Sequence, residues 1–201
     1  NAKIFIIIEN SKELEIILNE FKSEKFYVLG SGSNLLVRDN GFDGTIIKLG
    51  KDFNKYNIVE DKLEVGASAL DVSLSNFALK NKIEGFEFYS GIPGSVGGAV
   101  KMNAGCFGSE TKDVIDSIEI YDKNFKKKIM SKEDIKLNYR TSIIRNNEII
   151  SKAIFKINYG DPNIIKEKMK NIKDKRLSSQ PLKNKTSGST FKNPKNLHAA
   201  K

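Results

Sequence analysis

Two glycine-rich stretches contain the residue types most suited to binding chemistry. The longer, Gly91 to Gly105, reads G-I-P-G-S-V-G-G-A-V-K-M-N-A-G, and the shorter, Gly30 to Asn34, reads G-S-G-S-N. Glycine allows a close approach of backbone, and the N–H groups of such loops can point at an anion. The longer stretch is too poor in side chains to build core. One such stretch alone is more typical of a surface loop, but two in one small chain indicate a ligand with an extended phosphate-bearing spine.

Neither stretch matches a common phosphate-binding motif. Gly30 and Gly32 give the start of G-x-G-x-x-G, but Leu35 occupies the third glycine position and no helical pattern follows directly. The sequence has no G-K-[S/T], which excludes a Walker phosphate loop. The shorter stretch therefore remains a candidate anion cradle of another kind.

Two further segments contain side chains that could take part in a reaction. Arg140, within Y-R-T-S, offers a guanidinium fork for a carboxylate or phosphate, although a Tyr-Arg pair is often ordinary surface. Ser189, within G-S-T-F-K-N-P, could act as a nucleophile only with His198, the single histidine; no G-x-S-x-G elbow supports such a triad, which stays open. Cys106, the single cysteine, is more typical of a small, half-buried thiol than of a reactive one.

The composition indicates a soluble globular protein. The chain has 201 residues, 39% of them hydrophobic and 29% charged, enough for one large or two small domains. No apolar run is long enough to span a membrane. A single cysteine excludes an internal disulfide and fits a reducing cytoplasm. With only one histidine beside it, the composition argues against a metal site of the His/Cys kind. Because the first residue is Asn1 rather than Met, we expect the numbered chain to begin partway into its gene product.

The positive charge is concentrated at the C-terminal end. Of the net charge of +9, residues 161–201 contribute +8 and residues 1–160 contribute +1. Such a segment could bind nucleic acid or an anionic small molecule, or could serve solubility alone. Phe191 is its only aromatic residue, too little for a base-stacking surface.

Hydrophobic periodicity predicts alternating helices and strands. Strands are expected at residues 1–8, 26–29, 45–49, 114–121 and 149–157, with a hairpin of 55–59 and 62–65. A helix capped by Asn10 and Glu13 should run to about residue 21, and another, with Leu70 and Leu74 on its buried face, should end near Asn81. Asp161 and Pro162 predict a basic helix, broken at Pro181 and residues 183–188.

With these segments in place, the chain resembles the UDP-N-acetylenolpyruvoylglucosamine reductase (MurB) family of flavoenzymes. Four motifs occur in the family order: L-G-S-G-S-N-L-L-V at residues 29–37, the stretch at 91–105, Y-R-T-S at 139–142 and G-S-T-F-K-N-P at 188–194. The resemblance runs over almost the whole chain and fits the more compact subclass. It implies an α+β, FAD-binding fold of the vanillyl-alcohol-oxidase type, with subdomains at 1–50 and 51–160 and the start of a substrate domain at 161–201.

The resemblance also implies a site and a reaction. FAD would be bound non-covalently and no metal would be needed; NADPH would reduce the flavin, which would reduce UDP-N-acetylglucosamine enolpyruvate for peptidoglycan synthesis. Arg140 would stabilise charge on the enolpyruvyl carboxylate, Ser189 would protonate the neighbouring carbon, Tyr139 and Asn193 would contact substrate, and the basic segment would suit the UDP diphosphate. The residues implied to hold FAD are Leu29, Gly30, Ser31, Gly32, Ser33, Asn34, Leu35, Gly91, Ile92, Pro93, Gly94, Ser95, Gly97, Gly98 and Ala99.

The sequence departs from the family pattern at both ends. No stretch matches the family's C-terminal catalytic glutamate, and the segment that normally precedes Asn1 is missing, so a fragment lacking both ends is expected. Its active site would be incomplete, and turnover is not assumed for this polypeptide alone. The resemblance implies a cytoplasmic monomer that binds neither nucleic acid nor membrane. Two alternatives remain: an oxidase of the same fold that uses oxygen, and a nucleic-acid-binding module built on the basic segment.

Overall fold

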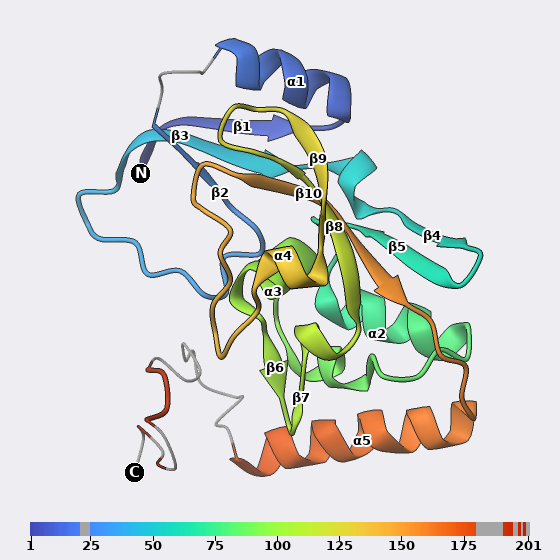
Figure 1. Cartoon of the computed structure of the whole chain (residues 1–201). Helices are drawn as coiled ribbons and strands as arrows, with labels where there is room; N and C mark the ends of the chain where they lie inside the picture. Colours follow the sequence, from blue (N-terminus) through green and yellow to red (C-terminus); the bar gives the residue numbers. More distant parts are fainter. Residues whose placement is uncertain (21–24, 180–190, 195–196, 198, 200–201) are drawn as a thin grey trace.

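The chain folds around two β-sheets that lie one above the other in Figure 1. This computed structural model describes residues 1–20, 25–179, 191–194, 197 and 199. Helices cover the sheets from outside, and the chain has the mixed α+β character expected from its sequence.

The first sheet is parallel and has three strands in the order β1-β3-β2. Its elements are β1 (Ala2–Ile8), α1 (Ser11–Glu20), β2 (Phe26–Val28) and β3 (Phe42–Leu49). Helix α1 begins as predicted, because the Asn10 side chain accepts a bond from the Glu13 amide (3.0 Å). The Glu13 carboxylate in turn accepts from the Glu9 amide (2.7 Å), one residue before the usual capping-box partner. Leu14 and Leu18 of α1 are buried with Ile47 of β3.

The second sheet is antiparallel, in the order β4-β5-β10-β8-β9. Its strands are β4 (Tyr56–Val59), β5 (Lys62–Gly66), β8 (Ile115–Tyr121), β9 (Lys127–Ser131) and β10 (Ile149–Lys156). The central strands supply much of the core, including Leu63, Val65, Ile118, Ala153 and Phe155, which are at most 1% exposed. Packing on both faces explains why these strands are rich in apolar residues rather than strictly alternating.

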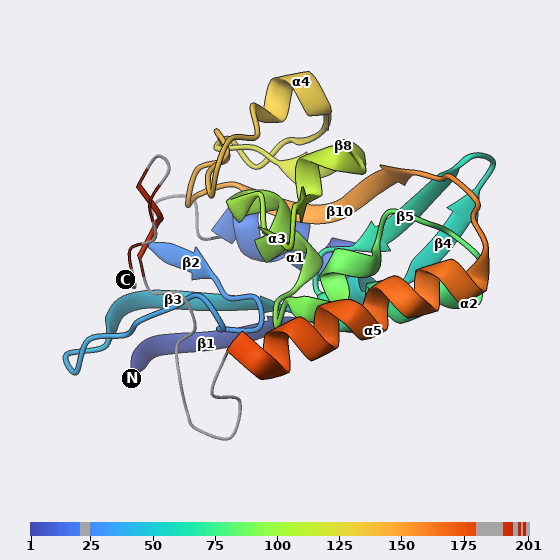
Figure 2. The ribbon, with the colours of Figure 1, turned by 90° about the horizontal axis from the view of Figure 1, so that it is seen from below.

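The remaining elements lie outside these two sheets, and most of them form a layer beneath the second sheet in Figure 1. They are η1 (Lys51–Asn54), α2 (Asp71–Lys80), η2 (Glu87–Gly91), α3 (Val96–Met102), β6 (Gly105–Cys106), β7 (Ser109–Glu110), η3 (Thr111–Asp113), α4 (Lys132–Ile135) and α5 (Pro162–Ser179). Helix α5 lies across this layer and contacts α2 and η2 (Figure 2). It begins at Pro162, with the Asp161 carboxylate accepting from the Asn163 amide (2.8 Å) as expected for a cap.

The structure corrects three expectations from the sequence. Leu70 is half exposed and precedes α2 as its N-cap, so it does not belong to the buried face. Strand β9 was not predicted, because K-K-I-M-S has too little apolar alternation. The stretch 91–105 does build core: Val96 and Val100 of α3 are fully buried. The predicted break at Pro181 and residues 183–188 lies outside the described residues.

Substitutions at two residues that face each other across the β4–β5 hairpin can test which side of the hairpin belongs to the core. Leu63 is fully buried, whereas its cross-strand partner Ile58 is 40% exposed. Leu63→Ala should lower the free energy of unfolding by about 2–5 kcal/mol, because it leaves a cavity, and Ile58→Ala by about 1 kcal/mol or less. Urea denaturation followed by circular dichroism measures both; equal losses would contradict this placement of the core.

Candidate functional site

The two glycine-rich stretches meet in the folded chain. A Cβ atom added to Gly30 would overlap the Ser95 hydroxyl, so a side chain there would require this hydroxyl or the loop to move. The Ser31 hydroxyl lies 3.4 Å from the Pro93 carbonyl, to which it donates, and 3.2 Å from the Ser33 hydroxyl. The two stretches that the sequence singled out therefore lie side by side in the fold.

The longer stretch is held from two sides. Along one side, the start of α2 pairs with it: the Asp71 amide donates to the Gly94 carbonyl (3.0 Å), and the Val96 amide donates to the Ala69 carbonyl (2.9 Å). Along the other side, the Arg176 guanidinium of α5 donates to the Gly91 carbonyl (2.7 Å). The loop is therefore fixed before any ligand arrives, which reduces the entropy cost of binding.

Several backbone donors remain available where the stretches meet. Within residues 25–179, the structure gives no protein acceptor for the amides of Gly94 and Ser95 or for those of residues 31–34. Successive unsatisfied N–H groups of this kind form a concavity suited to an anion. The two stretches therefore fit a phosphate-bearing ligand.

The residues predicted for this ligand occupy three successive parts of the fold. Residues 29–35 follow β2 and form a mostly exposed loop. Gly91 is the last residue of η2, and residues 92–95 connect η2 to α3. Residues 97–99 lie inside α3, where the Gly97 amide donates to the Ala67 carbonyl (2.9 Å) and Ala99 is buried. The part of the prediction within α3 thus includes residues with a clear packing role.

A buried carboxyl group lies against the longer stretch. Asp71 is fully buried, and neither of its carboxyl oxygens has a hydrogen-bond partner among the described residues. A Cβ atom on Gly94 would overlap this carboxyl group. Burial raises the pKa of Asp71 from 3.8 to about 8, so the group is mainly neutral at pH 7. Sequence reasoning missed it, because an Asp in the first turn of a helix usually interacts with the helix end or water.

Arg140 lies at the far end of the same stretch. Its guanidinium donates to the carbonyl oxygens of Gly105 (2.6 Å) and Asn103 (3.2 Å), and it lies over the Tyr139 ring, 5.1 Å from the centroid. Its φ of +55° places it at the tip of a tight hairpin between α4 and β10. The structure thus brings the Y-R-T-S segment and the Gly91–Gly105 stretch together.

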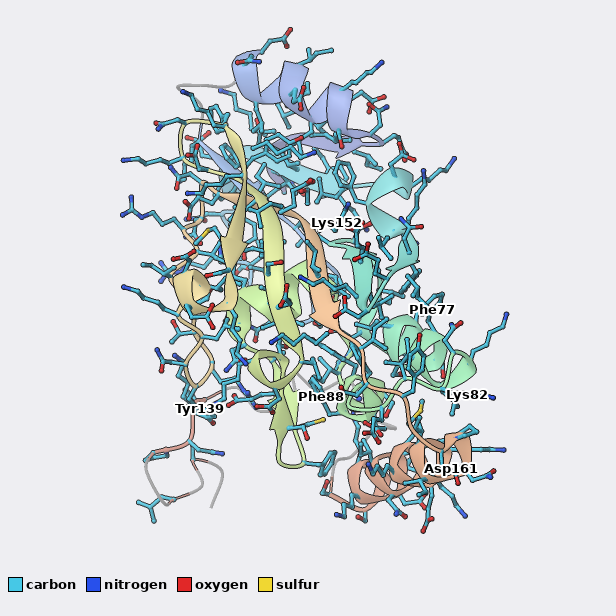
Figure 3. The ribbon with its side chains drawn as sticks, turned by 45° about the vertical axis from the view of Figure 1, so that its right-hand side comes forward. Phe77, Lys82, Phe88, Tyr139, Lys152 and Asp161 are labelled. Atoms are coloured by element: carbon cyan, nitrogen blue, oxygen red, sulfur yellow. The ribbon has the colours of Figure 1, made fainter. Side chains whose placement is uncertain are left out.

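Tyr139 also connects this hairpin to the C-terminal residues. Its hydroxyl oxygen accepts a bond from the Asn193 amide (3.4 Å), and Figure 3 shows Tyr139 just above the described C-terminal segment. Tyr139, Arg140 and Asn193 therefore come together, as a shared site would require. Ser189 and His198 lie outside the described residues.

Cys106 has the properties of a structural thiol. Its Sγ is half-buried and donates to the Phe88 carbonyl (3.1 Å), and burial raises its pKa to about 11 despite the nearby Arg176 and Arg140 charges. Within the described residues, no group of three or more His, Cys, Asp or Glu side chains could hold a metal ion. No described helix is both long and apolar enough to cross a membrane.

The comparisons with known proteins agree with this geometry. Residues 2–124 match the FAD binding domain family. The chain is 44% identical over 195 residues to the UDP-N-acetylenolpyruvoylglucosamine reductase of Rickettsia conorii, covering 96% of this chain and 66% of that protein. Among solved structures, the enzyme of the same name (MurB) from Thermus caldophilus superimposes with a TM-score of 0.86 at 31% identity, over 97% of this chain and 70% of that one. The chain belongs to the UDP-N-acetylenolpyruvoylglucosamine reductase family.

Membership of this reductase family confirms the resemblance inferred from the four motifs. The match of residues 2–124 to the FAD binding domain family also confirms an FAD-binding α+β fold. Quinoline 2-oxidoreductase of Pseudomonas putida has a similar fold, with a TM-score of 0.61 at 12% identity. The chain spans 66% of the length of the Rickettsia reductase and 65% of that of the Clostridium tetani reductase, with which it is 40% identical.

The contact between Gly30 and Ser95 can be tested by a substitution that creates a steric overlap and a second one that removes it. Gly30→Ala should weaken FAD binding about tenfold or more, because the new methyl group displaces the shorter stretch from Ser95. Ser95→Ala removes the overlapping oxygen, so the double variant should bind more tightly than Gly30→Ala alone. FAD fluorescence titration measures all four proteins. If the double variant binds FAD no more tightly than Gly30→Ala alone, the overlap with Ser95 does not explain the effect of Gly30→Ala.

The buried carboxyl group of Asp71 predicts a pH-dependent stability. Because its folded pKa is raised from 3.8 to about 8, its favourable contribution is complete below about pH 3.8 and is lost as the pH rises to about 8. Asp71→Asn keeps the shape but cannot ionise. It should therefore flatten the decline in the free energy of unfolding between pH 5 and 8, by about 1–3 kcal/mol.

Urea denaturation at several pH values measures this effect. Asp161→Asn, at the exposed start of α5, is the matched control, because it removes an aspartate that is not buried. A decline of the same steepness in wild type and Asp71→Asn would contradict the buried, neutral state of Asp71.

Proposed function

We propose that the protein containing this chain is an FAD-dependent reductase that takes hydride from NADPH and reduces UDP-N-acetylglucosamine enolpyruvate in peptidoglycan synthesis. The observation that carries the proposal is the placement of one continuous stretch, Gly91–Gly105, between two complementary features. One end meets the shorter glycine stretch, and the other end holds Arg140. The names of the Rickettsia and Thermus relatives support this substrate.

The residues present fit FAD at the meeting point of the two stretches. The available amides of Gly94, Ser95 and residues 31–34 would donate to its diphosphate, and Gly30 keeps the stretches close enough to act together. Neutral Asp71 behind the loop avoids placing a negative charge against those phosphates. When bound, FAD supplies a centre that accepts a hydride and passes it on.

Arg140 is placed to stabilise negative charge on the substrate. Addition of hydride to the enolpyruvyl double bond builds charge on its carboxylate, and a fixed cation facing that group lowers the barrier. Each of the Nη1 and Nη2 atoms of Arg140 donates one bond to a protein carbonyl, and the guanidinium has five N–H groups in all. Donors therefore remain for a carboxylate while the group is held in place.

Other residues would complete the substrate site. Tyr139 and Asn193 would contact the substrate beside Arg140, and Ser189 would deliver the proton to the carbon next to the one that receives the hydride. The UDP diphosphate would be neutralised by basic residues of the third segment. A groove of about 800 Å³ between α2 and α5, with Lys166, Lys170 and Lys173 in its lining, shows how that segment gathers positive charge.

Reconstitution with FAD separates binding from turnover. The purified chain, mixed with FAD and desalted, should keep a flavin absorption spectrum, which a chain without the cradle would not. In the protein containing this chain, anaerobic NADPH should bleach the flavin, and UDP-N-acetylglucosamine enolpyruvate should restore its colour. A chain that retains no FAD would contradict the cofactor assignment. Reoxidation by oxygen but not by the enolpyruvyl sugar would indicate the oxidase alternative.

Arg140 variants test its place in the reaction. Arg140→Leu should slow reoxidation of the flavin by the enolpyruvyl substrate about 10²–10³-fold, because the fixed cation is lost, with flavin reduction changed about twofold or less. Arg140→Lys keeps the charge but not the planar fork, so an intermediate loss is expected. Stopped-flow absorbance at the flavin band resolves the two half-reactions. Equal slowing of both would contradict the assigned role.

A further inference from the structure

Asn103 is the buried polar residue with the most connections to the hairpin that presents Arg140. Its side chain is fully buried and has all its hydrogen-bonding groups used. The Nδ2 group donates to the Glu110 carboxylate (2.8 Å) and to the Asn138 carbonyl (3.0 Å), and Oδ1 accepts from the Lys112 amide (2.9 Å). A buried network with every member satisfied specifies one arrangement of the chain.

The backbone of Asn103 also contacts the guanidinium. Asn103 ends α3 in the left-handed region (φ +42°), which turns its carbonyl toward Arg140 Nη1 (3.2 Å). Asparagine tolerates this conformation better than most residues. One residue thus contacts the hairpin twice: through its side chain at Asn138, where the hairpin begins, and through its carbonyl at Arg140, at the tip.

The other contacts of the hairpin hold either the guanidinium or the backbone, but not both. The Gly105 carbonyl accepts from Arg140 Nη2 (2.6 Å) and contacts only the side chain. The two backbone bonds of the Asn138–Thr141 pair (3.0 and 3.1 Å) close the hairpin within itself. The Ser142 hydroxyl donates to the Lys101 carbonyl (2.7 Å) and anchors only the side that leads away from the tip. If the Asn103 side-chain bonds were lost, the hairpin could keep its shape while its start shifted, and the guanidinium would be held mainly by the Gly105 carbonyl.

We propose that Asn103 is the positioning residue for Arg140, fixing the guanidinium at the end of the Gly91–Gly105 stretch by holding both the start and the tip of its hairpin. This inference rests on the proposed function, in which Arg140 faces the carboxylate of an anionic substrate. Asn103 itself touches neither substrate nor cofactor in this scheme. Its effect is on where the Arg140 charge lies.

Two sets of variants separate this role from simple packing. Asn103→Gly accepts the left-handed backbone and removes only the side-chain bonds. Lys136→Gly is the matched control, because Lys136 ends α4 with a similar φ of +50° and lies outside the network. The exchange pair Asn103→Asp with Glu110→Gln reverses the donor and acceptor between these two positions, but leaves no donor for the Asn138 carbonyl.

Cys106 reports the position of Arg140 without flavin or substrate. It is the only cysteine in the chain, it follows the Gly105 carbonyl that Arg140 binds, and the Arg140 charge lowers its pKa. If the guanidinium moves away, the thiol pKa rises, the thiolate fraction falls and alkylation at pH 8.5 becomes slower. Opening of the structure would instead expose the thiol and make alkylation faster.

We expect iodoacetamide to react about threefold more slowly with Arg140→Leu, Asn103→Gly and the exchange pair than with wild type. Lys136→Gly should react at the wild-type rate. Wild-type rates in the Asn103 variants, or in Arg140→Leu, would overturn the proposal. If Asn103→Gly reacts faster because it opens, the exchange pair decides: slow alkylation supports the proposal, and a wild-type or faster rate overturns it.

A kinetic measurement links the position to the reaction. In the FAD-loaded protein containing this chain, Asn103→Gly should slow flavin reoxidation by the enolpyruvyl sugar at least tenfold with little change in reduction by NADPH, as Arg140→Leu does. If wild type shows no reoxidation, the proposed function fails while the alkylation result still judges the position of Arg140. If Asn103→Gly reoxidises normally while Arg140→Leu does not, the positioning role is wrong.

Discussion

The close approach of Gly30 to Ser95 is the constraint on which the arrangement of the site depends. It joins a loop of the first sheet to the segment that enters α3 beneath the second sheet, so it brings together two parts of the chain that have separate hydrogen-bond ladders. A side chain at Gly30 would overlap the Ser95 hydroxyl and displace it or the loop. The absence of side chains thus serves first to bring the protein's own backbones together, and only then to leave amides available to a ligand.

The Gly91–Gly105 stretch packs into the core through part of its residues and leaves others for the binding role that we propose. Val96 and Val100 face the core, while Gly97 lies so close to Ala67 that a Cβ there would come within 3.0 Å of the Ala67 Cβ. Tight packing of α3 fixes the loop before it and the turn after it together. The position of the amides at Gly94 is therefore coupled to that of the carbonyls that hold Arg140, over a single short helix.

Local patterns in the sequence were sufficient for most elements but not for the polar contacts between them. The cap at Asn10, the β4–β5 hairpin and the start of α5 at Pro162 depend on neighbouring residues, and all were predicted. Leu70 was misplaced because helical spacing alone does not show that a helix begins one residue later. Asp71 and Asn103 could not be recognised, since their burial is created by segments distant in the chain.

The family motifs singled out Arg140 where local patterns could not. Arg140 in a Tyr-Arg pair resembles ordinary surface, and only the order of four motifs distinguished it; the structure then supplied the carbonyls of Asn103 and Gly105 that hold its guanidinium. Structures 12% identical to this chain share the fold, so the fold itself does not select this chemistry.

The charges along the stretch fit the ligands that we propose for its two ends. An anion bound by backbone amides is favoured by a neutral surrounding, and Asp71 satisfies this because burial without a partner keeps it protonated. A developing carboxylate charge needs a full positive charge that does not relax, which a guanidinium tied to two carbonyls provides. Water would screen both effects, so each depends on the packing of α3 that keeps Asp71 and Asn103 buried. The same apolar contacts that stabilise the fold therefore determine the strength of the electrostatic interactions at both ends of the site.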